Sequence, residues 1–138
     1  MTVEDIAISR PLPELRGDTK QFYAALAEGR LDFQRCTTCG QWQFPPREMC
    51  PRCATETLVW ETSPQAGTVF TYTVARRPLH PAFQAVPFVI VGVEFESGPR
   101  LMGRLVGVSP EDVEIDMSVR LAARIESDGV ALIEFERT

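Results

Sequence analysis

The chain has 138 residues, of which 44% are hydrophobic and 24% charged, and its formal net charge is −5. That length allows one ordinary domain or two small ones, with a single modest core. The acidic balance argues against a protein that holds nucleic acid through a strongly basic surface. The chain shows no signal peptide and no apolar run of membrane-spanning length, so we expect it in the cytoplasm.

The first 30 residues predict an extended arm followed by a short helix. Residues 1–17 contain two prolines and end in glycine, which is typical of irregular chain. Asp18 precedes a helical pattern and Gln21 follows three residues later, at the spacing of a capping box. The predicted helix covers 19–29, where Gly29 ends it. Its apolar residues are Phe22, Tyr23 and Leu26. This face must dock, either on the same chain or on a partner.

All four cysteines lie close together in two Cys-x-x-Cys pairs, Cys36 with Cys39 and Cys50 with Cys53. Disulfides would suit a secreted protein, and nothing here indicates export. Two such pairs place four thiolates around one ion, so the spacing predicts a four-cysteine zinc site. Iron is the variant to exclude, because rubredoxin uses similar pairs. A metal with four thiolate ligands stabilises structure and activates no water.

The residues beside the cysteines fit this interpretation, with one departure. Gly40 follows the first pair and can adopt the positive φ that a metal-binding turn often needs. Pro51 presets φ for the second turn, but Ala54 stands where a second glycine would be expected. We expect residues 31–62 to form a zinc ribbon whose folding depends on the metal.

The rest of the chain reads as a series of short strands, which predicts a five-stranded barrel of the OB type. Several strands alternate apolar and polar residues, and turn sequences separate them. The expected strands are 68–77, 88–96, 100–107, 119–126 and 130–136. A helical turn at 109–111 interrupts the series between the third and fourth strands. A generic sandwich is the alternative to the barrel.

The expected fold is therefore mainly β, with an N-terminal helix, a rubredoxin-like zinc ribbon and a C-terminal OB-fold barrel. The three parts are an arm and helix over 1–30, the ribbon over 31–62 and the OB-fold domain over 63–138.

The sequence offers no residue set for catalysis by this chain alone, and we assign no catalytic residue. The cysteines are assigned to the metal, and no phosphate-binding loop or serine elbow is present. The one histidine, His80, lies in the irregular stretch 78–87, which an OB barrel often uses for binding. A lone loop histidine is more often solvent-exposed than catalytic. A binding or accessory role is favoured.

The order of helix, ribbon and barrel resembles the family once called domain of unknown function 35, acyl-CoA-associated OB-fold proteins with a rubredoxin-like zinc ribbon. The resemblance covers about residues 22–135. The matching segments are FYAALAEGRLDFQRC, CTTCGQWQFPPREMCPRC, the Trp60 strand, GTVFTYTV, PFVIVGVEFESGPRLMGRLVG and SPEDVEIDMSVRL. It implies a non-catalytic partner of a thiolase-superfamily enzyme (thiolase, acyl-CoA aldolase or acyltransferase), in a hetero-oligomer where the small protein helps form the acyl-CoA channel.

Coenzyme A is the ligand that this resemblance implies. Arginine suits its phosphates because a guanidinium can contact them bidentately. The candidates are Arg76 and Arg77, at the end of the first barrel strand, and Arg47 in the ribbon. An exposed apolar patch for the partner is expected from Phe44, Pro45, Pro46, Phe83 and Val86. The alternative is that ribbon and barrel pack on each other there.

Two other functions stay open from the sequence. Zinc ribbons and OB barrels also occur in proteins that bind single-stranded nucleic acid, where Phe70, Tyr72 and Phe95 would stack on bases. The acidic barrel segment argues against this function. Rubredoxin-like electron transfer would require iron in place of zinc.

Overall fold

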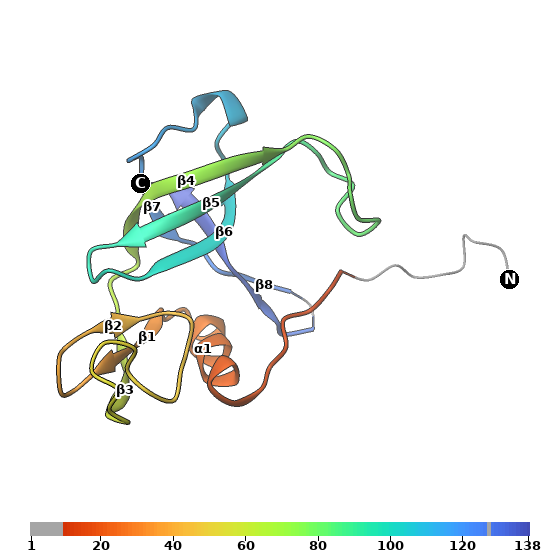
Figure 1. The fold of residues 1–138 in the computed structure, drawn as a ribbon. Coiled ribbons are helices and arrows are strands. Elements are labelled where there is room, and N and C mark those ends of the chain that lie inside the picture. The colour runs from red at the N-terminus through yellow and green to blue at the C-terminus, as the bar shows by residue number, and fades with distance from the viewer. Residues whose placement is uncertain (1–9, 127) are drawn as a thin grey trace, which may run out of the picture.

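The computed structural model describes residues 10–126 and 128–138 and combines a short helix, a ribbon sheet and a closed β-barrel (Figure 1). The N-terminal elements are α1 (Gly17–Ala27), β1 (Asp32–Cys36), β2 (Trp42–Gln43) and β3 (Leu58–Thr62). The later elements are β4 (Ala66–Ala75), β5 (Phe88–Phe95), β6 (Arg100–Val106), the 3-10 turn η2 (Pro110–Asp112), β7 (Ser118–Leu121), β8 (Arg124–Ile125), β9 (Ala131–Leu132) and β10 (Glu134–Arg137). The predicted mainly β fold is confirmed. Among the described residues, no helix is long and apolar enough to cross a membrane.

Helix α1 packs against its own chain. Phe22, Ala25 and Leu26 are buried, and the helix contacts both β1 and β9. Gly29 adopts φ +80° just past the helix and donates its N–H to the Leu26 carbonyl, as a glycine that ends a helix does. Of the two alternatives for the apolar face of this helix, docking on the same chain is the one observed.

The predicted capping box is wrong. The helix begins at Gly17, its N-cap is Arg16, and no side chain caps it. The Thr19 N–H donates to the Arg16 carbonyl at 3.1 Å, so the first turn closes before the predicted start. Asp18 lies inside that turn, where a carboxylate is favoured by the positive end of the helix dipole.

Strand β1 is the centre of the ribbon sheet, which has the order β2-β1-β3 with antiparallel neighbours. Its pairing with β3 runs from Asp32 opposite Thr62 to Cys36 opposite Leu58. This register places the turn after β1 beside the end of the loop that enters β3. The two segments that carry the cysteines therefore meet at one end of the sheet.

The barrel closes through five strands in the order β10-β6-β5-β4-β7. Its pairs are antiparallel except β10 with β6, which is parallel. A register shift between Val69 and Thr71 marks a bulge in β4, a feature that bends a strand and helps a sheet to curve. The predicted five-stranded OB barrel is confirmed, and so is the helical turn between its third and fourth strands.

Two of the predicted strands are interrupted. Segment 119–126 divides into β7 and β8, and segment 130–136 divides into β9 and β10. Strands β7 and β10 belong to the barrel, whereas β8 and β9 pair with each other as a separate hairpin. The Ala122 N–H donates to the Glu134 carbonyl where the hairpin leaves the barrel. Residue alternation continues through this point and so does not reveal the break.

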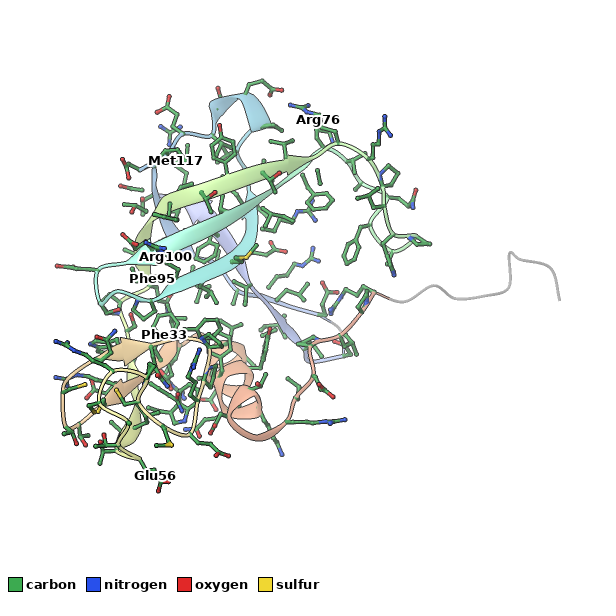
Figure 2. The ribbon with its side chains drawn as sticks, in the orientation of Figure 1. Phe33, Glu56, Arg76, Phe95, Arg100 and Met117 are labelled. Carbon is green, nitrogen blue, oxygen red and sulfur yellow. The ribbon has the colours of Figure 1, made fainter. Side chains whose placement is uncertain are left out.

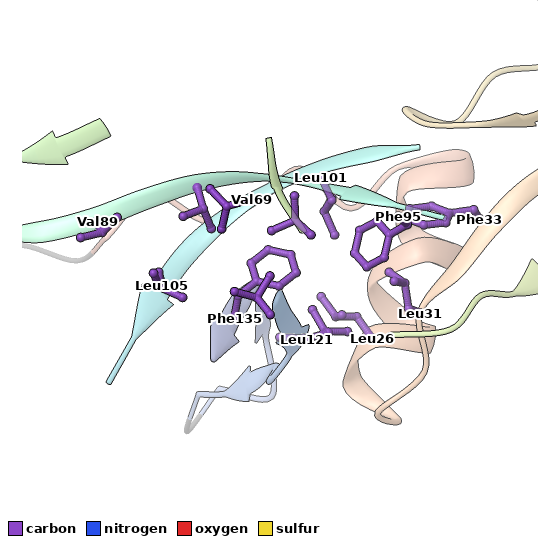
Figure 3. Packing of buried hydrophobic residues seen from close by; sticks show 14 of the residues in the cluster. Leu26, Leu31, Phe33, Val69, Val89, Phe95, Leu101, Leu105, Leu121 and Phe135 are labelled. Carbon is purple, nitrogen blue, oxygen red and sulfur yellow. The ribbon is translucent and has the colours of Figure 1, made fainter. Parts of the chain in front are cut away.

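One hydrophobic core joins the ribbon to the barrel (Figure 3). The ring of Phe33 on β1 lies 5.5 Å from the ring of Phe95 on β5, measured between centroids. Phe95 in turn lies 6.3 Å from Phe135 on β10. Leu26 of α1 and Leu31 belong to the same cluster. The helix and ribbon are therefore packed onto the barrel through shared side chains.

Candidate functional site

The four cysteines converge at one end of the ribbon sheet. The Sγ atoms of Cys36 and Cys53 are 3.6 Å apart, and so are those of Cys39 and Cys50. All four sulfur atoms lie within 4.8 Å of one another. Four thiolates bound tetrahedrally at ~2.3 Å from zinc have sulfurs roughly 3.8 Å apart. The geometry therefore fits a structural zinc ion with all four coordination positions filled by thiolate.

Hydrogen bonds from neighbouring groups favour the thiolate form of two ligands. The pKa of Cys36 is lowered to about 5, first by the Thr57 hydroxyl and next by the Cys39 backbone N–H. The pKa of Cys53 is also lowered, mainly because the Thr55 side chain donates to its sulfur. Such donors around a metal orient its ligands. Sequence reasoning missed both threonines, although they follow the second cysteine pair directly.

The two cysteine pairs close equivalent turns. Gly40 adopts φ +76° and donates its N–H to the Cys36 carbonyl. Ala54 adopts φ +57° and donates its N–H to the Cys50 carbonyl. The second turn therefore has the left-handed backbone expected of a glycine, but an alanine occupies it at a steric cost.

A buried glutamine holds the loop that leads to the second cysteine pair. Gln34 on β1 is 4% exposed. Its Oε1 accepts the Arg47 N–H at 2.7 Å and the Gln43 side-chain amide at 2.6 Å. Its Nε2 donates to the Arg47 carbonyl at 3.0 Å. The sequence gives no signal for this role, because a glutamine in a strand usually faces solvent.

The structure separates the arginines that were predicted to bind coenzyme A. Arg76 and Arg77 are exposed and follow the end of β4, at the barrel end far from the ribbon (Figure 2). Arg47 is exposed on the ribbon loop after β2. None of the three pairs with a carboxylate among the described residues. Arg47 therefore lies in a different part of the molecule from Arg76 and Arg77.

The predicted apolar patch that joins ribbon and barrel residues is wrong. The ring of Phe44 lies 5.0 Å from that of Phe22 and 5.7 Å from that of Phe33, so it completes the contact between helix and ribbon. Phe83 lies on the loop between β4 and β5, which extends away from the ribbon (Figure 1). The stacking partners of Phe44 are in the helix and the ribbon, not in the barrel as the alternative had it. His80 has a local role, since its Nδ1 accepts the Ala82 N–H.

A cleft of about 590 Å³ opens beside the loop between β4 and β5. Residues 82–85 of that loop line it, together with side chains from β5, β6 and the β8–β9 hairpin. Sequence reasoning indicated the loop as a binding element. It did not place Arg104, Arg124 or Glu134 in the same cleft, because these residues come from strands that are distant in the sequence.

Two family models match adjacent parts of the chain. Residues 24–59 match the model described as "ChsH2, rubredoxin-like zinc ribbon domain". Residues 60–124 match the model described as "ChsH2, C-terminal OB-fold domain". Together they cover the end of α1, the ribbon and four of the five barrel strands, but not β10.

Curated relatives include subunits and scaffold proteins. A "Probable enoyl-CoA hydratase alpha subunit" of Thermomonospora curvata is 40% identical over 114 residues, which is 81% of this chain and 35% of that protein. The "3-oxo-4,17-pregnadiene-20-carboxyl-CoA hydratase alpha subunit" of Mycobacterium tuberculosis is 34% identical over 78% of this chain and 34% of its own length. The chain thus spans about a third of these subunits. A "DUF35 domain-containing scaffold protein" of Methanocaldococcus jannaschii is 39% identical over 69% of each chain.

Two solved structures also resemble this chain. A chain of the "Ltp2-ChsH2(DUF35) aldolase" superposes with a TM-score of 0.83 at 34% identity, over 91% of this chain and 98% of that one. A DUF35 protein of unknown function from Sulfolobus solfataricus, at 16% identity and a TM-score of 0.63, shares the fold. The chain therefore belongs to the DUF35 family, whose ChsH2-type members join a rubredoxin-like zinc ribbon to an OB-fold domain.

Proposed function

We propose that this chain is a non-catalytic accessory subunit that binds an acyl-CoA thioester and completes or stabilises a thiolase-like enzyme. The observation that carries the proposal is the similarity to the chain of the "Ltp2-ChsH2(DUF35) aldolase", which extends over nearly the whole length of both chains. The names of two relatives specify CoA thioesters and describe subunits, and a third relative is described as a scaffold protein. We propose a cytoplasmic hetero-oligomer with the catalytic residues in the partner.

The metal centre supports an accessory role in physical terms. Four thiolates fill the tetrahedron of a zinc ion, so the ion has no position for water or substrate. The cluster stabilises the ribbon, and the ribbon shares its core with the barrel. The zinc would therefore maintain the shape of the whole subunit without taking part in bond making or breaking.

Two exposed arginines are the residues that we propose bind the coenzyme A part of the thioester. Arg76 and Arg77 are adjacent and have no carboxylate partner among the described residues. Guanidinium groups in this state can contact a phosphate without first breaking an ion pair. We assign these two residues to the phosphates of coenzyme A. Arg47, on the ribbon, is assigned to a separate contact.

The test is affinity purification of the tagged chain from its native host, followed by mass spectrometry. We expect a thiolase-superfamily enzyme to co-purify in near-equal amount. The isolated chain should be inactive on acyl-CoA thioesters, and the complex should be active. Full activity of the isolated chain, or purification without an acyl-CoA enzyme, would contradict the proposal.

A substitution tests the arginine assignment. Arg76→Ala should raise the KM of the complex for its acyl-CoA about tenfold or more, because a charge-assisted hydrogen bond is lost. Arg137→Ala, which removes an exposed arginine at the end of β10, is the matched control and should leave KM unchanged. An unchanged KM in the Arg76 variant, with normal folding, would remove this residue from the site.

Binding of single-stranded nucleic acid is a second candidate, because two aromatic residues are exposed on β4. Phe70 is 47% exposed and Tyr72 39% exposed, whereas Phe95 is buried. The guanidinium of Arg100 already covers the Phe70 ring at 3.6 Å from its centroid, and the net charge is −5. Salt-sensitive binding of a fluorescent oligonucleotide at micromolar protein would favour this function. We expect no such binding.

A further inference from the structure

The cleft beside the loop between β4 and β5 has the size and lining of a small-molecule site. Its volume of about 590 Å³ falls within the range of typical ligand pockets. One wall is the loop segment 82–85, another is formed by β5 and β6, and the third is the β8–β9 hairpin. The first described residue, Arg10, also lines it.

Most of the cleft is apolar. Its larger apolar side chains are Phe83, Phe88, Ile90, Met102, Leu132 and Ile133. Met102 is 67% exposed and Phe83 is 41% exposed. Apolar surface of this kind gains stability when a ligand removes it from water. The cleft therefore favours a ligand with a hydrocarbon body.

The charged residues of the cleft leave one cation uncompensated. Arg124 Nε lies 3.1 Å from Oε1 of Glu134, whose side chain is 9% exposed, and Arg124 also pairs with Glu126. Arg10 lies 4.0 Å from a carboxylate oxygen of Asp128. Arg104 forms no ion pair among the described residues, although Glu134, which pairs with Arg124, is its register neighbour on β10.

Arg104 packs against an aromatic ring. Its guanidinium carbon lies 5.3 Å from the ring centroid of Phe88, within the range of a cation–π contact. The position of Arg104 on β6 is fixed by pairing with Ile90 on β5. An exposed guanidinium without an ion pair, at the wall of an apolar cleft, is suited to a carboxylate group.

We propose that this cleft binds an amphipathic anion, with its hydrocarbon body against Phe88, Ile90 and Met102 and its anionic group on Arg104. The anionic group is a free carboxylate attached to the hydrocarbon body, because the pantetheine arm of an acyl-CoA separates its phosphates from its acyl chain. This inference does not rest on the proposed function. The site is distinct from Arg47, Arg76 and Arg77, which do not line the cleft.

The experiment measures binding to the isolated, zinc-loaded chain by titration calorimetry. The probes are decanoate, decanoyl-CoA and coenzyme A without an acyl group. Binding of decanoate would support the inference. Binding of decanoyl-CoA or coenzyme A without binding of decanoate would contradict it.

Three variants locate the site. Arg104→Gln should weaken binding roughly ten- to a hundredfold, because a charge-assisted contact is lost. Arg100→Gln is the matched control on the same strand, since Arg100 pairs with Glu94 and does not line the cleft, and it should leave binding within twofold. Met102→Ser should weaken the acyl-chain probes about threefold or more.

Two results would overturn the inference. One is the absence of decanoate binding at millimolar concentration, and the other is equal binding of decanoate by the Arg104→Gln and Arg100→Gln variants. Because the isolated chain is used, either failure leaves the co-purification test of the proposed function unaffected. Conversely, binding in the cleft without any co-purifying enzyme would support the site and contradict the accessory role.

Discussion

The two turns that close the metal site use the same backbone but different residues. Gly40 and Ala54 both have positive φ, and each donates its N–H to the carbonyl of the first cysteine of its pair. Glycine has no Cβ and adopts this conformation readily, whereas alanine is strained in it. Ala54 is exposed, so packing does not explain the alanine.

Ala54→Gly should therefore stabilise the protein. Glycine removes the energetic cost of the left-handed backbone, and this gain is larger than the entropic cost of a more flexible unfolded chain. The net increase in the free energy of unfolding should be about 0.5–1 kcal/mol. Urea denaturation measures it. Ala24→Gly, at an exposed position inside α1, is the matched control and should destabilise by about 1 kcal/mol. A loss of stability in both variants would contradict the strain at Ala54.

The metal ligands could be predicted from the sequence, whereas the residues that support them could not. Two Cys-x-x-Cys pairs encode a four-ligand site in their spacing alone. The roles of Gln34 and Thr57 depend on which backbone and sulfur atoms the fold brings beside them. The same applies to Arg104, whose importance follows from strand pairing and from a cleft that three distant segments form.

At the scale of elements, the ribbon depends on its metal. A structural zinc site contributes about 10 kcal/mol or more to folding, which is comparable to the total stability of a typical domain. Cys36→Ser should therefore reduce bound zinc from near one ion per chain to a small fraction, and the ribbon should unfold. Metal analysis and thermal unfolding measure both effects. Arg52→Gln, an exposed change between Cys50 and Cys53, should retain zinc. Normal zinc content in the Cys36 variant would contradict the four-cysteine site.

Close approach of strands in the barrel depends on glycine at specific positions. A Cβ on Gly103 would lie 2.7 Å from the Ile133 carbonyl oxygen and 2.8 Å from the Phe135 ring. A Cβ on Gly92, on the neighbouring strand, would meet the Thr71 methyl group at 2.8 Å. Backbone and a buried ring cannot move aside easily, whereas an exposed threonine side chain can.

Gly103→Ala should therefore destabilise the protein by about 1–3 kcal/mol, the cost of overpacking a rigid site. Gly92→Ala is its matched control and should cost less than about 1 kcal/mol. Midpoints of urea unfolding compare the two. If Gly92→Ala lowers the stability as much as Gly103→Ala or more, then the close approach of β6 to Ile133 does not require glycine at position 103.

The order and type of the elements could be predicted because strand alternation and turn residues are local signals. The separate β8–β9 hairpin could not be predicted. Apolar and polar residues keep alternating through Ala122 and Ala123, although β7 pairs with β10 and β8 pairs with β9. The predicted start of α1 was wrong because it also relied on a local sequence pattern alone. The Asp18 and Gln21 spacing matches a capping box, but the first turn closes on the Arg16 carbonyl.

At the scale of the whole molecule, the metal ribbon and the barrel share a core. Phe33 is fully buried and its ring contacts those of Phe44 in the ribbon and Phe95 in the barrel. Loss of the ribbon would expose this side of the barrel core to water. The zinc site is therefore coupled to barrel stability through packing, although no cysteine lies in the barrel.

This coupling predicts a single cooperative unfolding transition. Trp42 and Trp60, the two tryptophans of the chain, both lie in ribbon strands, so their fluorescence follows the ribbon. Hydrogen exchange of the β5 amides follows the barrel. We expect the two urea transitions to coincide, and a zinc chelator to shift both to lower urea. A barrel that stays protected after the tryptophan signal has changed would contradict this coupling.

The variant Phe33→Ala tests the contact that carries the coupling. Removing this ring should cost about 3–5 kcal/mol, as for other buried phenylalanines, and should separate the two transitions. Phe83→Ala is the matched control, because Phe83 is 41% exposed on the loop between β4 and β5, and it should change stability by less than about 0.5 kcal/mol. If Phe33→Ala lowers stability while the transitions still coincide, other contacts of the shared core, such as those of Phe22 and Leu26, must carry the coupling instead.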